Sequence, residues 1–217
     1  MYDRIEDALG NDYLMFFHPA WPCVNLTPVC NVDQCLAQVN FALEKYGTDL
    51  TKWTDSLQNQ IAKLFRVSWI LQRLSIESIR KPILVHKEGL RFVIDCGDTR
   101  LMAKMLSADP GTVPVVATCK KSQCNDYMDW IAVESTEHLK TLSGFDNSAE
   151  VLLSATQGTH AVSWLEIGDQ TTAHHLHDES LRLKWMQQFI NLHDQNYRFS
   201  REWFTVPVDQ LMNSPNH

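Results

Sequence analysis

The stretch between residues 81 and 118 restricts the possible folds more than any other part of the chain, and it reads KPILVHKEGLRFVIDCGDTRLMAKMLSADPGTVPVVAT. Its apolar residues follow a short strand-like pattern, then helical spacing, and then a strand-like pattern again. Gly89 and Pro110-Gly111, which favour turns, separate these segments. The pattern predicts strands at 83–85 and 90–94, a helix at 101–106 and a strand at 113–118.

A polar loop, Gly97-Asp98-Thr99-Arg100, comes directly before the predicted helix. The first backbone N–H groups of a helix have no partner within the helix, and together with the helix dipole they attract anions. An arginine adds a guanidinium group that can bind phosphate through two hydrogen bonds. We therefore expect Gly97, Thr99 and Arg100 to hold a phosphate group.

Three further polar residues flank or belong to this loop. Asp95 and Asp98 are candidates for catalysis, because a carboxylate can bind Mg²⁺ or accept a proton from a hydroxyl group. Asp98 also has a structural alternative, which is to cap the helix that follows it. His86 comes at the end of the first predicted strand, and it is either a contact for phosphate or an ordinary surface residue.

The rest of the chain adds helices on both sides of this stretch. Helical spacing predicts a helix from Asp33 to Tyr46, with Asp33 at its start and Gly47 after its end, and helical structure from Leu50 to Leu74. Prolines after residue 17 are expected to end an early strand. The other predicted elements are strands at 13–17, 130–133, 151–155, 161–167 and 204–208, a helix at 135–142 and a helix after residue 178. This mixture predicts an α+β (α/β) fold, with helices flanking a small mixed sheet.

Composition and charge narrow the class of protein. The chain has 217 residues, of which 44% are hydrophobic and 21% charged, as in an ordinary globular protein. It has no apolar run of about 18 residues and no apolar signal core at its start, so we expect a cytoplasmic protein that does not enter membranes. A net charge of −7 disfavours a general nucleic-acid binder. Residues 71–121 nevertheless carry nine Lys or Arg against five Asp or Glu, which suits a small anionic ligand unless it is a chance fluctuation.

Cysteines and histidines offer two weak metal candidates. The six cysteines lie at positions 23, 30, 35, 96, 119 and 124. In a cytosolic protein we expect them to be reduced, buried thiols, with zinc binding by Cys30, Cys35, Cys119 and Cys124 as a loose alternative. The run HHLHD at 174–178 is the second candidate, because alternate residues such as His175 and His177 share a face of an extended segment.

The segments around the polar loop resemble the N-terminal domain that ParB partition proteins share with sulfiredoxin. In that family a "PI.V" strand and a hairpin precede a loop that ends in arginine, and a helix and a "VP..V" strand follow. The order and spacing of ESIRKPILV, GLRFVIDCGDTRLMA and VPVVAT agree with this pattern over about residues 68–118. The matching residues are Pro82, Ile83, Val85, Gly97, Thr99, Arg100, Ala103, Val113 and Pro114.

The resemblance implies binding of a nucleoside triphosphate, ATP or CTP, with Mg²⁺ and with the loop arginine on the phosphates. Family activities include CTP-gated clamping on DNA, ATP-dependent repair of oxidised peroxiredoxin and phosphorylation of free serine. Asp98 stands in place of the sulfiredoxin cysteine, with Cys96 lying before the glycine, and Thr99 replaces one arginine of the partition proteins. The loop is thus most similar to the D-G-H-T-R form of ParB-like serine kinases and phage ParB-like proteins.

These observations lead to one main hypothesis and two alternatives. The main one is a nucleotide-binding, ParB-like phosphotransferase or NTPase that acts on a small molecule or a nucleotide. The first alternative is a non-catalytic module that binds a protein partner, with the nucleotide as a switch or the site vestigial. The second is an accessory protein of DNA modification or partition, which would need a partner to bind DNA. The predicted divisions are a helical region at 1–67, the ParB/sulfiredoxin-like core at 68–120 and an elaboration at 121–217.

Overall fold

The computed structural model describes residues 9–28, 30–74, 78–146, 151, 179–192, 199–201 and 204. The chain forms an α+β fold, as predicted, and divides into two compact units. The first unit combines Met1–Val29 with Ser78–Gly168, and the second combines Cys30–Glu77 with Asp169–His217. These limits differ from the predicted divisions after residues 67 and 120, because the N-terminal segment contributes a strand to the sheet of the first unit.

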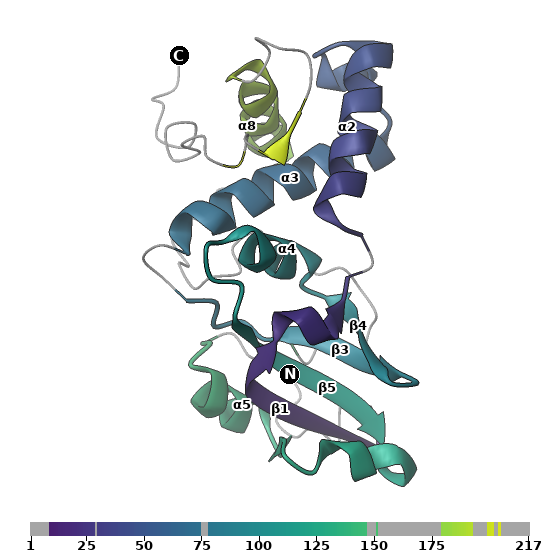
Figure 1. The fold of residues 1–217 in the computed structure, drawn as a ribbon, viewed down its shortest axis with the longest axis vertical. Coiled ribbons are helices and arrows are strands. Elements are labelled where there is room, and N and C mark those ends of the chain that lie inside the picture. The colour runs from purple at the N-terminus through teal and green to yellow at the C-terminus, as the bar shows by residue number, and fades with distance from the viewer. Residues whose placement is uncertain are drawn as a thin grey trace. The chain divides into compact units, whose positions relative to one another are not determined.

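A mixed sheet with the strand order β2-β4-β3-β5-β1-β6 forms the centre of the first unit (Figure 1). Its strands are β1 (Tyr13–Pro22), β2 (Leu26–Thr27), β3 (Ile83–Glu88), β4 (Arg91–Cys96), β5 (Thr112–Lys120) and β6 (Ile131–Val133). β3 and β4 form the predicted hairpin, and α4 (Asp98–Leu106) leads from β4 to β5, which runs parallel to β3. The carboxyl ends of β3 and β5 therefore lie at the same edge of the sheet.

Strand β1 is longer than the sequence predicts. It continues to Pro22 and pairs antiparallel with β5 on one side and with β6 on the other. The pairing with β5 shifts between His18 and Trp21, so Pro19 lies in an irregular segment where its missing N–H group removes no ladder hydrogen bond. The expectation that the prolines end this strand was wrong for that reason.

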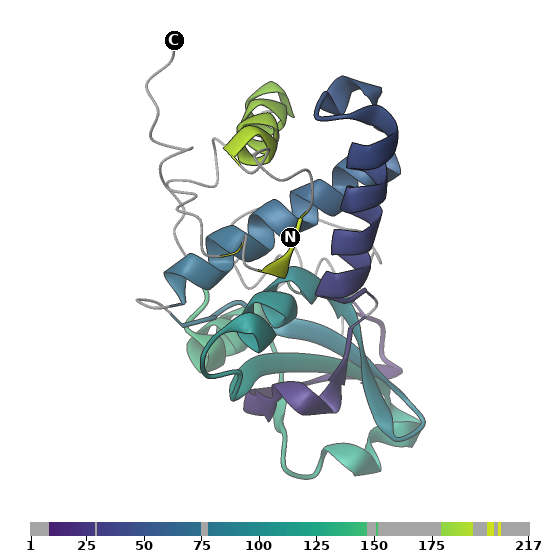
Figure 2. The same ribbon diagram turned by 45° about the horizontal axis from the view of Figure 1, so that its top comes forward.

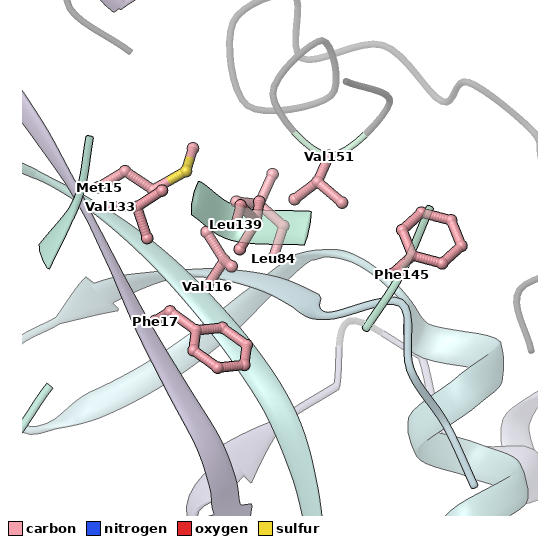
Figure 3. Packing of buried hydrophobic residues seen from close by; sticks show 8 residues of the cluster. All are labelled: Met15, Phe17, Leu84, Val116, Val133, Leu139, Phe145 and Val151. Atoms are coloured by element: carbon pink, nitrogen blue, oxygen red, sulfur yellow. The ribbon is translucent and has the colours of Figure 1, made fainter. Parts of the chain in front are cut away.

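The helix α5 (Thr136–Ser143) covers part of one face of the sheet and confirms the helix predicted at 135–142. The Ser135 side chain accepts a hydrogen bond from the His138 N–H group at 3.1 Å, and Gly144 ends the helix with a φ of 66°. Beneath α5 lies an apolar cluster from several elements (Figure 3). Its buried members are Met15, Phe17, Leu84, Val116, Val133, Leu139, Phe145 and Val151. In Figure 1, α4 lies above β3 and α5 lies below it.

The second unit contains helices. They are α2 (Val32–Tyr46), the short η2 (Leu50–Lys52), α3 (Asp55–Arg73) and α8 (Glu179–Leu192), as Figures 1 and 2 show. Phe65 of α3 contacts Phe189 of α8 with 5.6 Å between ring centroids, so two sequence-distant segments share this core. Asn31, not Asp33, caps α2: its side chain accepts from the Gln34 N–H group at 2.9 Å.

Several predicted features lie outside the described residues. They are His175, His177 and, apart from Val151 and Phe204, the strands predicted at 151–155, 161–167 and 204–208. Within the described ranges, none of the helices has the length and apolarity needed to cross a membrane.

Candidate functional site

The predicted phosphate loop is packed against the start of β3. Gly97 is the N-cap of α4 with a φ of 113°, a conformation that favours glycine. Thr99 and Arg100 follow in the first turn and are 5% and 0% exposed. Arg100 Nη2 donates to the Pro82 carbonyl oxygen at 3.3 Å, and a Cβ atom on Gly97 would lie 2.6 Å from the same nitrogen. The guanidinium group thus fills the space that Gly97 leaves and connects the start of α4 to the start of β3.

Two other charged residues lie near this loop, Asp98 and Lys81. Asp98 is the first residue of α4 and not its cap, so the capping alternative was wrong, although a carboxylate in the first turn still suits the helix dipole. Lys81 is only 2% exposed, and its Nζ atom lies 5.7 Å from the centre of the Phe145 ring. Two basic side chains, Lys81 and Arg100, are therefore buried where β3 begins.

His86, near the other end of β3, has a different environment. Its Nδ1 atom lies 2.8 Å from a carboxylate oxygen of Asp95, and its Nε2 atom lies 3.0 Å from one of Glu88. The hydrogen bond with Glu88 and the charge of Asp95 raise the pKa of His86 above its usual value of 6.5, although partial burial opposes the change. The structure thus joins the predicted residues His86 and Asp95 on the β3–β4 hairpin, while Arg100 lies beneath the Gly97 loop.

A cavity of about 670 Å³ opens at the edge of the sheet where β3 and β5 end. Its walls come from β1, β3, the hairpin turn, β5 and the short helix η3 (Lys121–Tyr127). The lining residues are Tyr13, His86, Lys87, Gly89, Thr118, Cys119, Lys120, Gln123, Asn125 and Tyr127. Among these described lining residues three are basic and none is acidic. Cavities of this size hold small molecules, and the carboxyl ends of parallel strands are a common place for them.

Of the predicted phosphate-binding and catalytic residues, all of which the structure describes, only His86 lines this cavity, and it is joined there by Cys119 from the loose zinc candidate. Lys120, Gln123 and Asn125 were missed because the sequence predicted no element between residues 119 and 129. The signal that could have found them is the polar run KKSQCND, which follows directly after the apolar strand VPVVAT and its cysteine. Recognising it needed the knowledge that β5 runs parallel to β3, because only then do the two strand ends meet.

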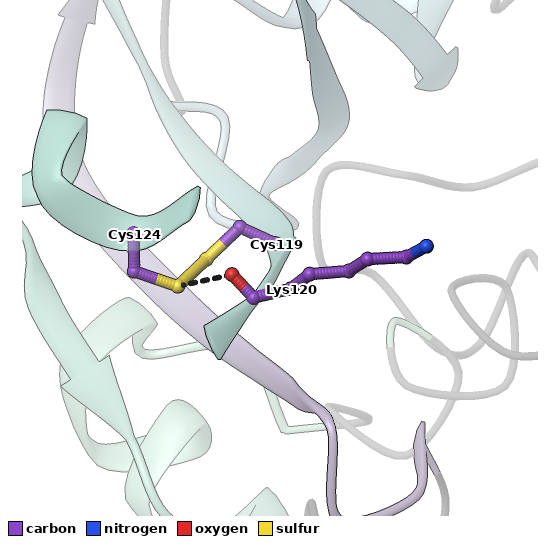
Figure 4. The surroundings of a disulfide bond; sticks show 3 residues. All are labelled: Cys119, Lys120 and Cys124. Atoms are coloured by element: carbon purple, nitrogen blue, oxygen red, sulfur yellow. Dashed lines mark hydrogen bonds between the residues drawn. A yellow bond between two sulfur atoms is a disulfide. The ribbon is translucent and has the colours of Figure 1, made fainter. Parts of the chain in front are cut away.

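The cysteines correct two expectations. Cys119, in β5, and Cys124, in η3, form a disulfide bond, so they are not free thiols and cannot serve as zinc ligands (Figure 4). The turn into η3 brings their Cα atoms to 6.1 Å, which is within the range that a disulfide spans. Cys30 and Cys35 lie in the second unit with their sulfur atoms 3.3 Å apart. No metal-binding group of three or more His, Cys, Asp or Glu side chains occurs among the residues that the structure describes.

Comparison with known proteins finds no relative of this chain. The chain matches no protein-family model, no curated protein and no solved structure. The resemblance to ParB and sulfiredoxin domains therefore remains a prediction that depends on the motif residues alone.

Proposed function

We propose that this protein binds a nucleotide in the cavity at the carboxyl ends of β3 and β5. The observation that carries the proposal is the basic lining: His86, Lys87 and Lys120 surround one cavity whose described walls contain no carboxylate. Phosphate groups carry negative charge that such side chains stabilise through charge-assisted hydrogen bonds. The raised pKa of His86 favours the imidazolium form over the neutral form that a general base requires. Both of its N–H groups meet the carboxylates of Asp95 and Glu88, so His86 contributes positive charge at the cavity wall and the lysines supply the hydrogen bonds to the ligand.

The size and polarity of the cavity favour a nucleotide over a simple phosphate ion. A volume of about 670 Å³ leaves room for a base and a sugar beside the phosphates. The amide side chains of Gln123 and Asn125 can form hydrogen bonds with the edge of a base, and Tyr13 offers an aromatic ring. The resemblance of residues 68–118 to nucleotide-binding ParB-like domains implies the same ligand class, but it places the phosphates on the loop before α4, which does not line this cavity.

In this proposal the loop before α4 has a supporting role. Gly97 and Arg100 hold the start of α4 against β3, and β3 in turn carries His86 and Lys87 into the cavity. The described lining does not include Asp95 or Asp98, the two predicted catalytic residues. The proposed activity is therefore binding, and Asp95 acts by orienting His86 through their 2.8 Å contact.

A titration with nucleotides tests this function. Calorimetry would measure the affinity of the full chain for ATP, CTP, GTP and ADP with Mg²⁺, and for adenosine and inorganic phosphate alone. We expect saturable binding of at least one triphosphate and a rise in melting temperature with its concentration. Adenosine should bind more weakly, because it lacks the charge that the lysines and His86 recognise.

Two neighbouring lysines provide a matched pair of variants. Lys120 lines the cavity and Lys121 does not, and both are exposed. We expect Lys120→Ala to lower the affinity about tenfold, the usual effect of one charge-assisted hydrogen bond, and Lys121→Ala to leave it unchanged. If no nucleotide binds, or if the two variants behave alike, the proposed site is wrong.

A further inference from the structure

The disulfide between Cys119 and Cys124 lies in the wall of the cavity. Cys119 is the second-last residue of β5 and lines the cavity directly. Cys124 lies in η3 between Gln123 and Asn125, which line it as well. Figure 4 shows the bond between the strand end and η3, with the Lys120 side chain extending away from the sulfur atoms.

Besides the disulfide, the middle of η3 approaches the sheet where Cys124 Sγ lies 2.9 Å from the carbonyl oxygen of Lys120, the last residue of β5. Two further contacts among the described residues involve the ends of η3. The Lys121 N–H group donates to the Asp12 carbonyl oxygen at 2.9 Å, and the Tyr127 ring stacks on Phe16 with 5.0 Å between centroids. Both contacts are at the ends of η3, whereas Gln123 and Asn125 are in its middle. A 3₁₀ helix is a weak element, so the covalent bond restricts the positions of these two amides more than the helix itself does.

We propose that the Cys119–Cys124 disulfide is a redox switch that controls nucleotide binding in this cavity, an inference that depends on the function proposed above. In the oxidised state, the bond holds η3 against the end of β5 and keeps the amide side chains of Gln123 and Asn125 at the ligand. In the reduced state, the middle of η3 is released and the affinity falls. Cys124 is the point of attack, because it is partly exposed whereas Cys119 is only 8% exposed.

The chemistry is thiol–disulfide exchange with a small dithiol. A thiolate of the dithiol attacks Cys124 Sγ, the bond between the protein sulfurs breaks, and Cys119 leaves as a thiolate that takes up a proton. The second thiolate of the dithiol then attacks the mixed disulfide, which releases Cys124 as a thiol and oxidises the dithiol to a cyclic disulfide. A low-molecular-weight disulfide reverses both steps, accepting two electrons while the protein loses two protons.

A second cysteine pair serves as an internal control. Cys30 and Cys35 have the same spacing as Cys119 and Cys124 and lie in the other unit, but their sulfurs, 3.3 Å apart, interact as thiols and form no disulfide. A change in redox state can affect both pairs, so a Cys30→Ser variant is used to distinguish the effect of one pair from that of the other. It removes the second pair and leaves the cavity wall intact.

The experiment compares affinities for ATP with Mg²⁺ in the oxidised and the dithiothreitol-reduced full chain, alongside Cys124→Ser and Cys30→Ser. Thiol counting should find four free thiols before reduction and six after it. We expect affinity to fall on the order of tenfold on reduction and in Cys124→Ser, as the constraint of a short closed loop is lost. Cys30→Ser should keep both the affinity and its response to reduction. A melting curve for each variant verifies that it is folded.

The possible failures are distinguishable. If oxidised protein with four free thiols binds no nucleotide, the proposed function is wrong and the redox inference falls with it. If oxidised and reduced protein bind equally well, nucleotide binding stands and the switch is refuted. Six free thiols in protein purified without reductant would also refute the switch.

Discussion

Basic side chains lie near both ends of strand β3, and the two ends differ in how far these side chains are buried. At its start, Lys81 and Arg100 are buried, and Arg100 contacts the Pro82 carbonyl oxygen and the Gly97 loop. At its other end, His86 and Lys87 face a cavity, and 38% of the His86 side chain is exposed. The comparison teaches that a loop with the sequence pattern of a phosphate-binding motif can hold a fold together, while the cavity proposed to bind a nucleotide opens where the same strand ends.

The start of β3 should respond to mutation with the largest loss of stability. Among the residues that the structure describes, Arg100 is the largest fully buried side chain, so Arg100→Ala leaves a cavity and removes the hydrogen bond to Pro82. We expect a loss of about 2–5 kcal/mol in the free energy of unfolding, the range for truncation of a large buried side chain. Chemical denaturation followed by tryptophan fluorescence measures it. A change below about 0.5 kcal/mol, typical of surface sites, would contradict the buried role of Arg100.

A smaller loss of stability is expected at Gly97. The φ of 113° is strained for any other residue, and a Cβ atom would displace the Arg100 guanidinium. Gly97→Ala should therefore cost about 1–3 kcal/mol, the usual penalty for such a backbone conformation. Gly89, in the β3–β4 turn, offers the control: its φ is 60°, but a Cβ atom there would meet nothing within 4 Å. A loss at Gly97 no greater than at Gly89 would show that Arg100 does not need the space.

The end of β3 should show a modest dependence on pH. The pKa of His86 is higher in the folded protein than its usual 6.5, so its contacts with Glu88 and Asp95 stabilise the fold fully below pH 6.5. This stabilisation, and the attraction of the imidazolium for phosphate, are lost as the pH rises through the higher folded value. The effect on stability should be small, because the side chain is partly exposed.

Nucleotide titrations across this pH range would measure the dependence. The terminal phosphate of ATP also changes its charge near neutral pH, so His86→Gln is the necessary reference. We expect the affinity of the original protein to fall more steeply with rising pH than that of the variant. If the affinities of the original protein and of His86→Gln fall equally with rising pH, the His86 imidazolium does not contribute to binding.

The sequence predicted the parts of the fold that depend on local chemistry. The helix α5 is an example, since Ser135 and Gly144 cap it and its apolar residues follow helical spacing. The β3–β4 hairpin and α4 also follow from short apolar runs and turn residues. Strand β1 was predicted only to Phe17, because the register shift that accommodates Pro19 depends on its pairing with β5.

The candidate site was much less predictable, for a physical reason. Its walls come from segments that lie far apart in the chain, such as Tyr13, His86 and Lys120, and only the parallel pairing of β3 with β5 brings them together. His86 was identified because it belongs to the hairpin beside the motif. The disulfide was missed because a cytosolic location was expected, and reduced thiols with it. The turn between Cys119 and Cys124, which brings the two residues within reach of a disulfide, could not be seen in the sequence.

The most direct test of the central claim is one calorimetric comparison of ATP–Mg²⁺ affinity in Lys120→Ala and Gly97→Ala, at a temperature where both variants are folded. The account predicts that Lys120→Ala weakens binding about tenfold, because it removes a charge-assisted contact in the cavity. It predicts that Gly97→Ala, though less stable, binds ATP with nearly unchanged affinity. Loss of binding in Gly97→Ala together with full affinity in Lys120→Ala would contradict the account and would place the binding site at the loop before α4.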